Sequence, residues 1–244
     1  MHNTELTGDS KPLLKPKKGW KGIGMEGVIA RYYDKNSRKT PEQYKSWAQR
    51  VAENFAQGNE VLEVAPGPGY LAILLAQLGK YNIVGLDISR TFVEIAQKNA
   101  TEAGVEDAIV FRQGDAAHMP FDDETFDFIV CTSAFKNFTD PLGALREMYR
   151  VLKENRTALI IDMRRDVSDK VLNDAVKSMG VSRINSLIMR WTFKYMLKRR
   201  AYTKNQFKDF ISKTQFRRYD IRGSEDLSPE TKINLIGFEI WLKK

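Results

Sequence analysis

The 244 residues, 42% of them hydrophobic, suffice for one α/β domain with insertions, and the net charge of +8 suggests anionic partners without choosing among a metabolite, nucleic acid and a membrane surface. A single cysteine, Cys131, excludes an internal disulfide framework, and with two histidines it leaves no Cys/His zinc constellation, so no metal is expected. No apolar run approaches the ~20 residues of a membrane span, and residues 1–18 lack the apolar centre of a signal peptide, which predicts a cytoplasmic protein.

Residues 1–24 are predicted to be a flexible basic arm, because they carry lysines and prolines with almost no apolar pattern. Two helices are expected within residues 25–58. The second begins after Thr40, which can cap it, with Pro41 at the first helical position and Gln43 completing a capping box. Since this helix pair precedes the first strand, we predict that it forms a lid over the site.

The stretch from Val61 to Tyr70 has the sequence VLEVAPGPGY, a short apolar strand that carries an acid and ends in a glycine turn. An apolar helical pattern follows at once. Backbone N–H groups and the helix N-terminus at such a turn lie beside the ligand of the crevice. A side chain at Gly67 or Gly69 would block close approach of a ligand to the backbone. The turn therefore predicts a nucleotide-like ligand.

Strands and helices alternate from this turn to Asp162. Four further strands are predicted, at residues 81–87, 108–115, 126–133 and 157–162. Ser89 and Asp140 are expected to cap the helices that follow the second and fourth strands. Because the strands are apolar on both faces, they predict a parallel sheet with helices on both sides. Residues 59–165 are expected to be the cofactor-binding core.

Beyond the core the pattern loosens into helices, and residues 166–213 are predicted to be a helical insertion that caps the acceptor site. Residues 214–244 are expected to complete the sheet with an antiparallel pair of strands, 216–221 and 233–242. Lysines and arginines are concentrated in residues 183–222. Such a segment suits either an anionic metabolite or a nucleic-acid surface.

The glycine turn allows two interpretations. It fits the loose dinucleotide fingerprint, with Asp87 about where a ribose-binding acid lies, so a nicotinamide or flavin oxidoreductase stays open. Against this, Glu63 lies near the end of the first strand, and Asp87 and Asp115 are the last residues of the second and third strands. Three carboxylates would repel a pyrophosphate. They suit a ligand with an amino group, a ribose and an adenine amine.

Five stretches stand in a familiar order and spacing: VLEVAPGPG (61–69), GLDIS (85–89), GDAAHMPF (114–121), FDFIV (126–130) and LREMYRVLK (145–153). Together they closely resemble the Rossmann-like (class I) S-adenosylmethionine-dependent methyltransferases, and most of all the type 11, ubiquinone/menaquinone-biosynthesis-like small-molecule group. The resemblance covers about residues 32–162. It implies an α/β three-layer sandwich whose seven-stranded, mostly parallel sheet has an antiparallel last strand.

The resemblance also implies which residues bind the cofactor, S-adenosyl-L-methionine. Four residues of the first strand and its turn would lie beside the methionine moiety: Glu63, Ala65, Gly67 and Gly69. Asp87 would accept both ribose hydroxyls, and Ile88 would pack on the adenine. Asp115 and Ala116 would hold the adenine edge.

Two further residues would close the cofactor site: Ser133 at the sulfonium end and Tyr33 as the lid tyrosine. The chain departs from the family pattern at two places. Ala65 stands where glycine is usual, a change that narrows the turn. Lys136-Asn137 stand where many relatives carry histidine, so histidine-based acceptor chemistry is not implied there.

The catalytic residues stay unknown at this point. A base is needed only if the acceptor must lose a proton, and the candidates are Tyr33, His118, Lys136 and Asp162. A structural role is favoured for His118, which lies beside the adenine-end segment of the family pattern. Lys136 either orients an anionic acceptor or is a solvated lysine.

We therefore expect an S-adenosylmethionine-dependent methyltransferase that acts on a small metabolite, anionic or not, by in-line methyl transfer, with S-adenosyl-L-homocysteine as product. Three alternatives stay open: an RNA methyltransferase, a cofactor-binding protein without transfer activity and, last, an NAD(P)-dependent oxidoreductase. The acceptor, the methylated atom and the oligomeric state do not follow from the sequence.

Overall fold

A seven-stranded sheet forms the centre of the computed structural model, which describes residues 21, 24–38, 41–178, 183–223 and 236–244. The strands are β1 (Glu60–Val64), β2 (Asn82–Asp87), β3 (Ile109–Gln113), β4 (Phe126–Thr132), β5 (Leu152–Met163), β6 (Arg218–Gly223) and β7 (Gly237–Lys243). They are arranged in the order β3-β2-β1-β4-β5-β7-β6. β1 to β5 pair in parallel, and β7 runs antiparallel to both β5 and β6. The predicted fold class is confirmed.

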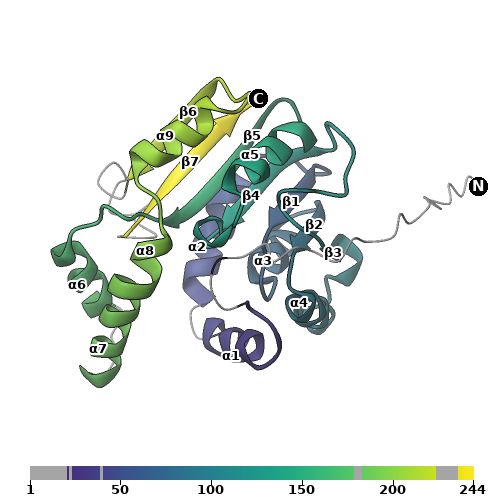
Figure 1. Cartoon of the computed structure of the whole chain (residues 1–244). Helices are drawn as coiled ribbons and strands as arrows, with labels where there is room; N and C mark the ends of the chain where they lie inside the picture. The colour runs from purple at the N-terminus through teal and green to yellow at the C-terminus, as the bar shows by residue number, and fades with distance from the viewer. Residues whose placement is uncertain (1–20, 22–23, 39–40, 179–182, 224–235) are drawn as a thin grey trace, which may run out of the picture.

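Helices cover both faces of the sheet (Figure 1). Those before and within the parallel part are α1 (Gly27–Ser37), α2 (Pro41–Ala52), α3 (Tyr70–Leu78), α4 (Arg90–Glu102) and α5 (Pro141–Val151), with short 3-10 turns η1 (Glu106–Ala108) and η2 (Phe135–Asn137). Those between β5 and β6 are α6 (Asp169–Ser178), α7 (Arg183–Trp191), the π-helical η3 (Thr192–Leu197), α8 (Lys198–Arg200) and α9 (Lys204–Ser212).

The hydrophobic core has two layers, one on each face of the sheet. α2, α3 and α4 pack on one face, and α5 and α9 pack on the other. Along β4, Phe128 and Val130 belong to the first layer, whereas Ile129 and Cys131 belong to the second. Successive side chains of a strand point to opposite faces, so this alternation explains why the strand is apolar at every position from Phe128 to Cys131. Cys131 is a buried free thiol, as expected.

Two helix starts confirm the capping residues that the sequence predicts. The Ser89 hydroxyl accepts a hydrogen bond from the Phe92 N–H, and Asp140 accepts one from the Gly143 N–H, with proline at the first position of α5. The predicted cap at Thr40 lies outside the described residues. A capping box not foreseen from the sequence begins α9, where Thr203 and Gln206 exchange hydrogen bonds.

β5 differs from the prediction, because it begins at Leu152 rather than at residue 157. Its first half is polar and gives no strand pattern. Lys153 and Arg156 from this half pair with Asp127 of β4 at 2.9 and 3.1 Å. Two ion pairs to Asp127 thus hold the polar first half of β5 beside β4, where the strand register shifts between Phe126 and Phe128.

The predicted division into arm, lid, core, insertion and final strands stays a prediction. Of the predicted arm, residues 1–24, only Lys21 and Gly24 are among the described residues, and residues 233–235 of the last predicted strand also lie outside them. In the described ranges, none of the helices has the length and apolar character needed to traverse a lipid bilayer.

Candidate functional site

Three acids lie where adjacent parallel strands end. Glu63 is the penultimate residue of β1, Asp87 is the last of β2, and Asp115 follows β3 by two residues. β2 pairs with β1 on one side and β3 on the other, so their carboxyl ends meet at one edge of the sheet. Ligands of such sheets bind outside this edge. The structure therefore brings the three predicted acids to the expected place.

Glu63 is completely buried, with 1% of its surface exposed. Its carboxyl group accepts a hydrogen bond from the Ala72 N–H at 3.0 Å and so ties β1 to the first turn of α3. Burial raises the pKa of Glu63 to about 8; the hydrogen bond from Ala72 opposes this shift, and the nearby Asp87 carboxylate adds to it. At neutral pH the protonated form of Glu63 is favoured.

Asp87 is also buried, and its two oxygens hold two different segments. One accepts the Gly67 N–H at 3.0 Å, and the other accepts the Ser89 N–H at 2.9 Å. Burial raises the pKa of Asp87 to about 6, although these backbone hydrogen bonds favour the ionised form. The carboxylate thus joins the glycine turn to the start of α4.

The glycine turn contains three residues in the left-handed region: Ala65, Gly67 and Gly69, with φ of 57°, 57° and 81°. A Cβ at Gly69 would stand 2.7 Å from Cζ of Phe111, so glycine is needed there for packing against β3. A Cβ at Gly67 would meet nothing within 4 Å. The backbone of Ala65 is strained, because the left-handed conformation costs an L-residue about 1–2 kcal/mol. The sequence did not predict this strain.

The segment after β3 forms a compact turn. Asp115 accepts the Ala117 N–H at 2.9 Å, and its second oxygen lies 3.6 Å from Nδ1 of the exposed His118 ring. Ala116 packs against the core, and the carbonyl of Ile88 accepts a hydrogen bond from the side-chain amide of Gln113 at 3.1 Å.

Among the described residues, His, Cys, Asp and Glu side chains form no group of three that could hold a metal ion.

The helix α1 lies over α4 at this edge. Tyr33 packs edge-on against Phe92 with ring centroids 5.8 Å apart. Just before α1, the Glu26 carboxylate accepts hydrogen bonds from the backbone N–H groups of Arg90 and Thr91 at 3.0 and 3.2 Å. These two N–H groups of the first turn of α4 have no partner within the helix, so Glu26 supplies it. Sequence analysis missed Glu26, because only the fold brings it to the N-terminus of a helix more than 60 residues away.

Ser133 and Lys136 follow β4. Ser133 has φ of 57°, and its carbonyl accepts a hydrogen bond from the Lys136 ammonium. Lys136 is buried, and its Nζ lies 2.8 Å from Asp162, whose second oxygen accepts the Lys136 N–H at 2.7 Å. The alternative of a solvated lysine is therefore wrong, since the η2 turn directs the side chain inward. Two of the candidate bases, Lys136 and Asp162, neutralise each other's charge.

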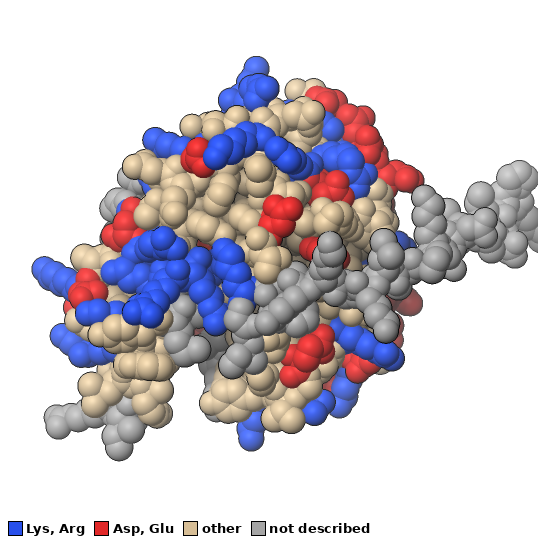
Figure 2. Space-filling model, viewed as in Figure 1, with Lys and Arg blue, Asp and Glu red and all other residues tan. Residues whose placement is uncertain are grey.

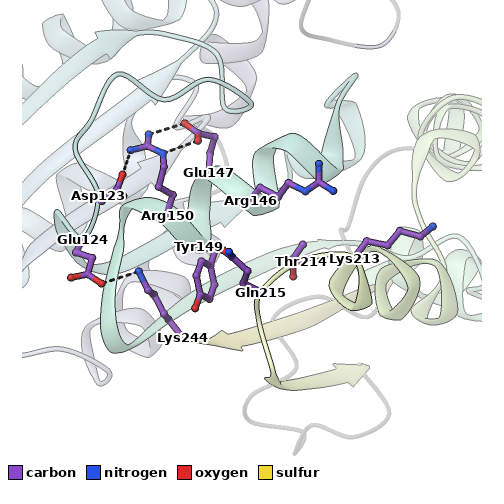
Figure 3. Close-up of a pocket in the computed structure, with 10 residues that line it drawn as sticks. All are labelled: Asp123, Glu124, Arg146, Glu147, Tyr149, Arg150, Lys213, Thr214, Gln215 and Lys244. Carbon is purple, nitrogen blue, oxygen red and sulfur yellow. Dashed lines mark hydrogen bonds and ion pairs between the residues drawn. The ribbon is translucent and has the colours of Figure 1, made fainter.

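A hollow of about 780 Å³ lies elsewhere on the surface (Figure 3). Glu124, which lines it, precedes β4, and Lys244 follows the antiparallel β7, so the hollow is at the amino-end edge of β4 and β5. Its charges are largely paired: Arg150 contacts Glu147 and Asp123 at 2.8 Å, and Lys244 contacts Glu124 at 3.2 Å. We therefore do not assign it to the site formed by the three acids.

The fold is Rossmann-like and of the methyltransferase type. Its marks are the strand order with one reversed strand, β7, the glycine turn after β1 and the acids at the ends of β1 to β3. Residues 62–160 match the family described as a methyltransferase domain. This part of the chain is therefore similar to methyltransferase domains, and the fold around it is that of Rossmann-like methyltransferases.

Similar proteins include a demethylmenaquinone methyltransferase of Lactiplantibacillus plantarum, 34% identical over 135 residues, which are 53% of this chain and 57% of the relative. The uncharacterized methyltransferase YcgJ of Bacillus subtilis is 34% identical over 131 residues, 54% of this chain and 50% of the relative. The chain thus spans about half the length of the curated relatives it matches.

Two solved structures share the fold over most of the chain. One is a protein of Methanococcus maripaludis assigned to the S-adenosyl-L-methionine-dependent methyltransferases, with a TM-score of 0.70, 24% identity and coverage of 91% of this chain and 95% of that one. The other is a SAM-dependent methyltransferase of Aquifex aeolicus, with a TM-score of 0.62, 18% identity and coverage of 87% and 95%.

Proposed function

We propose that this protein is an S-adenosylmethionine-dependent methyltransferase that acts on a small-molecule acceptor. The observation that carries the proposal is the buried Asp87 carboxylate, which holds the Gly67 turn from the end of β2 within the methyltransferase domain. The names of the relatives from Lactiplantibacillus plantarum and other bacteria support an acceptor of quinone type. The chain spans only about half the length of these relatives, so a quinone-type acceptor is proposed for this chain and not taken over from them.

The residues at the carboxyl edge fit this cofactor. Each Asp87 oxygen accepts one backbone N–H and has a further lone pair for a ribose hydroxyl. The open space at Gly67 admits a ligand against the backbone. Glu63 and Asp87 suit an amino group and hydroxyls, whereas the ionised Asp87 carboxylate would repel a pyrophosphate. This set of acceptor groups argues against the dinucleotide oxidoreductase.

When bound, S-adenosylmethionine supplies a methyl group that its sulfonium has already activated. The contribution left to the chain is alignment for in-line transfer, for which positioning supplies up to ~7–11 kcal/mol. In the proposed arrangement Asp87 and Ile88 fix the nucleoside, and Asp115 with Ala116 orients the adenine edge. Glu63 and the turn at Ala65, Gly67 and Gly69 hold the methionine end.

The proposed acceptor side lies between two groups of helices. Tyr33 on α1 closes the cofactor from one side, and Ser133, between β4 and η2, stands on the other. The helices α6 to α8 follow β5 and extend beyond the same edge of the sheet (Figure 1). Their role is to exclude water from the transfer and to hold the acceptor in line.

Calorimetric titration with S-adenosylmethionine, S-adenosylhomocysteine, NAD and NADP tests the cofactor. Binding of the first two and not of the dinucleotides supports the proposal, and the reverse result contradicts it. Transfer of radiolabelled methyl groups is then measured with a small-metabolite extract and with total RNA. Label in RNA alone would show that the acceptor class is wrong, and binding without any transfer would favour a protein that only binds the cofactor.

A further inference from the structure

Two cations meet beside β4 and β5 without an acidic partner. Arg165 follows the carboxyl end of β5, and Lys21 comes from the segment before α1. Within the described part of the chain, neither forms an ion pair with a carboxylate. Partial burial and the Arg165 charge both lower the pKa of Lys21. Like charges held together in a partly buried position are unfavourable unless an anion compensates them.

Tyr202 fixes both cations in place. The Lys21 ammonium donates a hydrogen bond to the Tyr202 hydroxyl and lies 4.6 Å from the centre of its ring. The Arg165 N–H donates to the Tyr202 carbonyl at 2.9 Å, and the Arg165 guanidinium donates to the Arg199 carbonyl at 2.8 Å. Since the Tyr202 ring also packs on Phe135 at 6.1 Å, the cluster is anchored in the core.

Two buried polar atoms of this region lack hydrogen-bond partners among the described residues: Nε of Arg165 and Oδ1 of Asn137. The Asn137 carbonyl accepts the Lys21 N–H at 2.7 Å, and the Arg165 charge acts on Lys21, so Lys21 lies between the two residues that carry these atoms. Buried polar atoms are nearly always paired in folded proteins. A ligand that brings both an acceptor and a donor would satisfy the two.

Basic residues are common on this surface, so charge alone does not single out Lys21 and Arg165. Figure 2 shows Lys and Arg side chains gathered where α8 lies in Figure 1. Several are paired: Lys194 and Lys198 contact Asp169 at 2.7 and 3.7 Å, and Lys213 contacts Asp209 at 2.7 Å. The Lys136 charge is likewise neutralised by Asp162. Overall basic charge therefore does not locate an anion. Lys21 and Arg165 differ because two cations act on each other beside two buried polar atoms that have no hydrogen-bond partner among the described residues.

We propose that Lys21, Arg165 and Tyr202 form a subsite for an oxyanion, carboxylate or phosphate, carried by the acceptor, and that Asn137 accepts a hydrogen bond from a hydroxyl or amine of the same molecule. Ammonium and guanidinium groups bind oxyanions through charge-assisted hydrogen bonds. Asn137 follows Ser133 by four residues, so the subsite adjoins the proposed sulfonium end. This inference rests on the proposed methyltransferase function, because only that function makes the ligand an acceptor.

The test titrates the full chain with inorganic phosphate and, separately, with acetate at constant ionic strength. The apparent Kd is obtained from the rise in melting temperature. Lys21→Met and Arg165→Gln are expected to weaken binding of the preferred anion at least about tenfold, the effect of losing one charged hydrogen bond. Arg146→Gln is the matched control, since Arg146 lies in the hollow of Figure 3 and also lacks an ion pair among the described residues. It should leave the Kd unchanged.

Equal anion affinity in the wild type, Lys21→Met and Arg165→Gln overturns the subsite. Arg165→Lys gives a second readout, because it keeps the charge but loses the planar fork, and an affinity between those of wild type and Arg165→Gln is expected. Titration of every protein with S-adenosylmethionine separates the two proposals. Intact cofactor binding without anion discrimination contradicts the subsite alone, whereas absent cofactor binding in the wild type contradicts the proposed function.

Discussion

The Tyr70 hydroxyl donates a hydrogen bond to the Asp34 carboxylate, and this contact ties α1 to the first residue of α3. Arg38 approaches the same carboxylate at 3.4 Å and also donates to Asn99 at 2.7 Å. Asn99 in turn donates to the Pro68 carbonyl, inside the glycine turn, at 2.9 Å. α1 is therefore coupled to the turn that we propose holds the cofactor.

The first prediction concerns this coupling. Tyr70→Phe keeps the ring and removes the hydroxyl that Asp34 accepts. A hydrogen bond to a charged group contributes about 1.5–3 kcal/mol, less where water reaches it. We expect amide hydrogen exchange in α1 to speed up about fivefold or more, measured by mass spectrometry. The control is Tyr32→Phe, which removes the hydroxyl of an exposed tyrosine on α1. Unchanged exchange in Tyr70→Phe would show that the contact does not hold α1.

The second prediction follows from the buried Glu63. Its pKa of about 8 exceeds the ordinary value of 4.5, so between these pH values the folded state binds more protons than the unfolded state. The free energy of unfolding therefore falls as the pH rises through this range. Glu63→Gln keeps an oxygen for the Ala72 N–H and does not titrate. In urea denaturation it should be more stable than the wild type at pH 8 and close to it at pH 5.

The control for this variant is Glu53→Gln, which changes an exposed glutamate. It should shift the free energy of unfolding equally little at both pH values. A Glu63→Gln protein that is less stable than the wild type at pH 8 would mean that the ionised carboxylate of Glu63, and not its protonated form, stabilises the junction of β1 and α3.

The third prediction concerns cofactor affinity at Asp87. The proposed bonds to ribose hydroxyls favour the ionised carboxylate, whose pKa is about 6 before binding. Affinity for S-adenosylmethionine should therefore fall as the pH drops below 6. Asp87→Asn should weaken binding at least about tenfold at pH 7.5 and remove this pH dependence. Calorimetry from pH 5 to 8 measures both. Unchanged affinity in Asp87→Asn would remove Asp87 from the proposed site, and the exposed Asp107→Asn is the control.

Most of the fold could be predicted because local patterns match the final environment. Phe128 to Cys131 are apolar at every position since both faces of β4 are covered. Ser89 and Asp140 mark helix starts because a short polar side chain there satisfies free N–H groups. The early start of β5 could not be predicted, because Asp127, which binds its basic residues, belongs to another strand.

The three acids of the candidate site could be located because parallel strands end at one edge, whatever the details of packing. The partners of Lys21 and Lys136 could not be found in this way. Tyr202 is 181 residues from Lys21, and Asp162 is 26 residues from Lys136. Only the folded chain decides whether a lysine near a strand end is solvated or buried against an acid, and a local pattern carries no information on that choice.

The fourth prediction concerns the strained Ala65, whose φ of 57° is costly for an L-residue. Ala65→Gly relieves about 1–2 kcal/mol of this cost but gives the unfolded chain about 0.5–1 kcal/mol of extra freedom. The variant should be up to about 1.5 kcal/mol more stable than the wild type, with unaltered or tighter binding of S-adenosylmethionine. Ala65→Val, with a branched side chain, should be destabilised. If Ala65→Gly unfolds more easily than the wild type, the left-handed conformation is not a source of strain.

The fifth prediction separates structure from chemistry at the Lys136–Asp162 pair. Lys136→Met leaves the buried Asp162 carboxylate without its cation, which costs about 3–5 kcal/mol, measured by urea denaturation. Asp162→Asn added to this variant should restore most of the loss, because no buried charge remains. Lys98→Met, which removes an exposed helical ion pair, should cost less than about 0.5 kcal/mol.

The same variants decide whether Lys136 acts as a base. If it does, Lys136→Met loses methyl transfer and the double variant Lys136→Met/Asp162→Asn stays inactive despite its restored stability. If the pair only holds the η2 turn and the Ser133 carbonyl, transfer recovers together with stability. We expect recovery, because an ammonium engaged by both Asp162 and Ser133 has no lone pair to accept a proton from an acceptor.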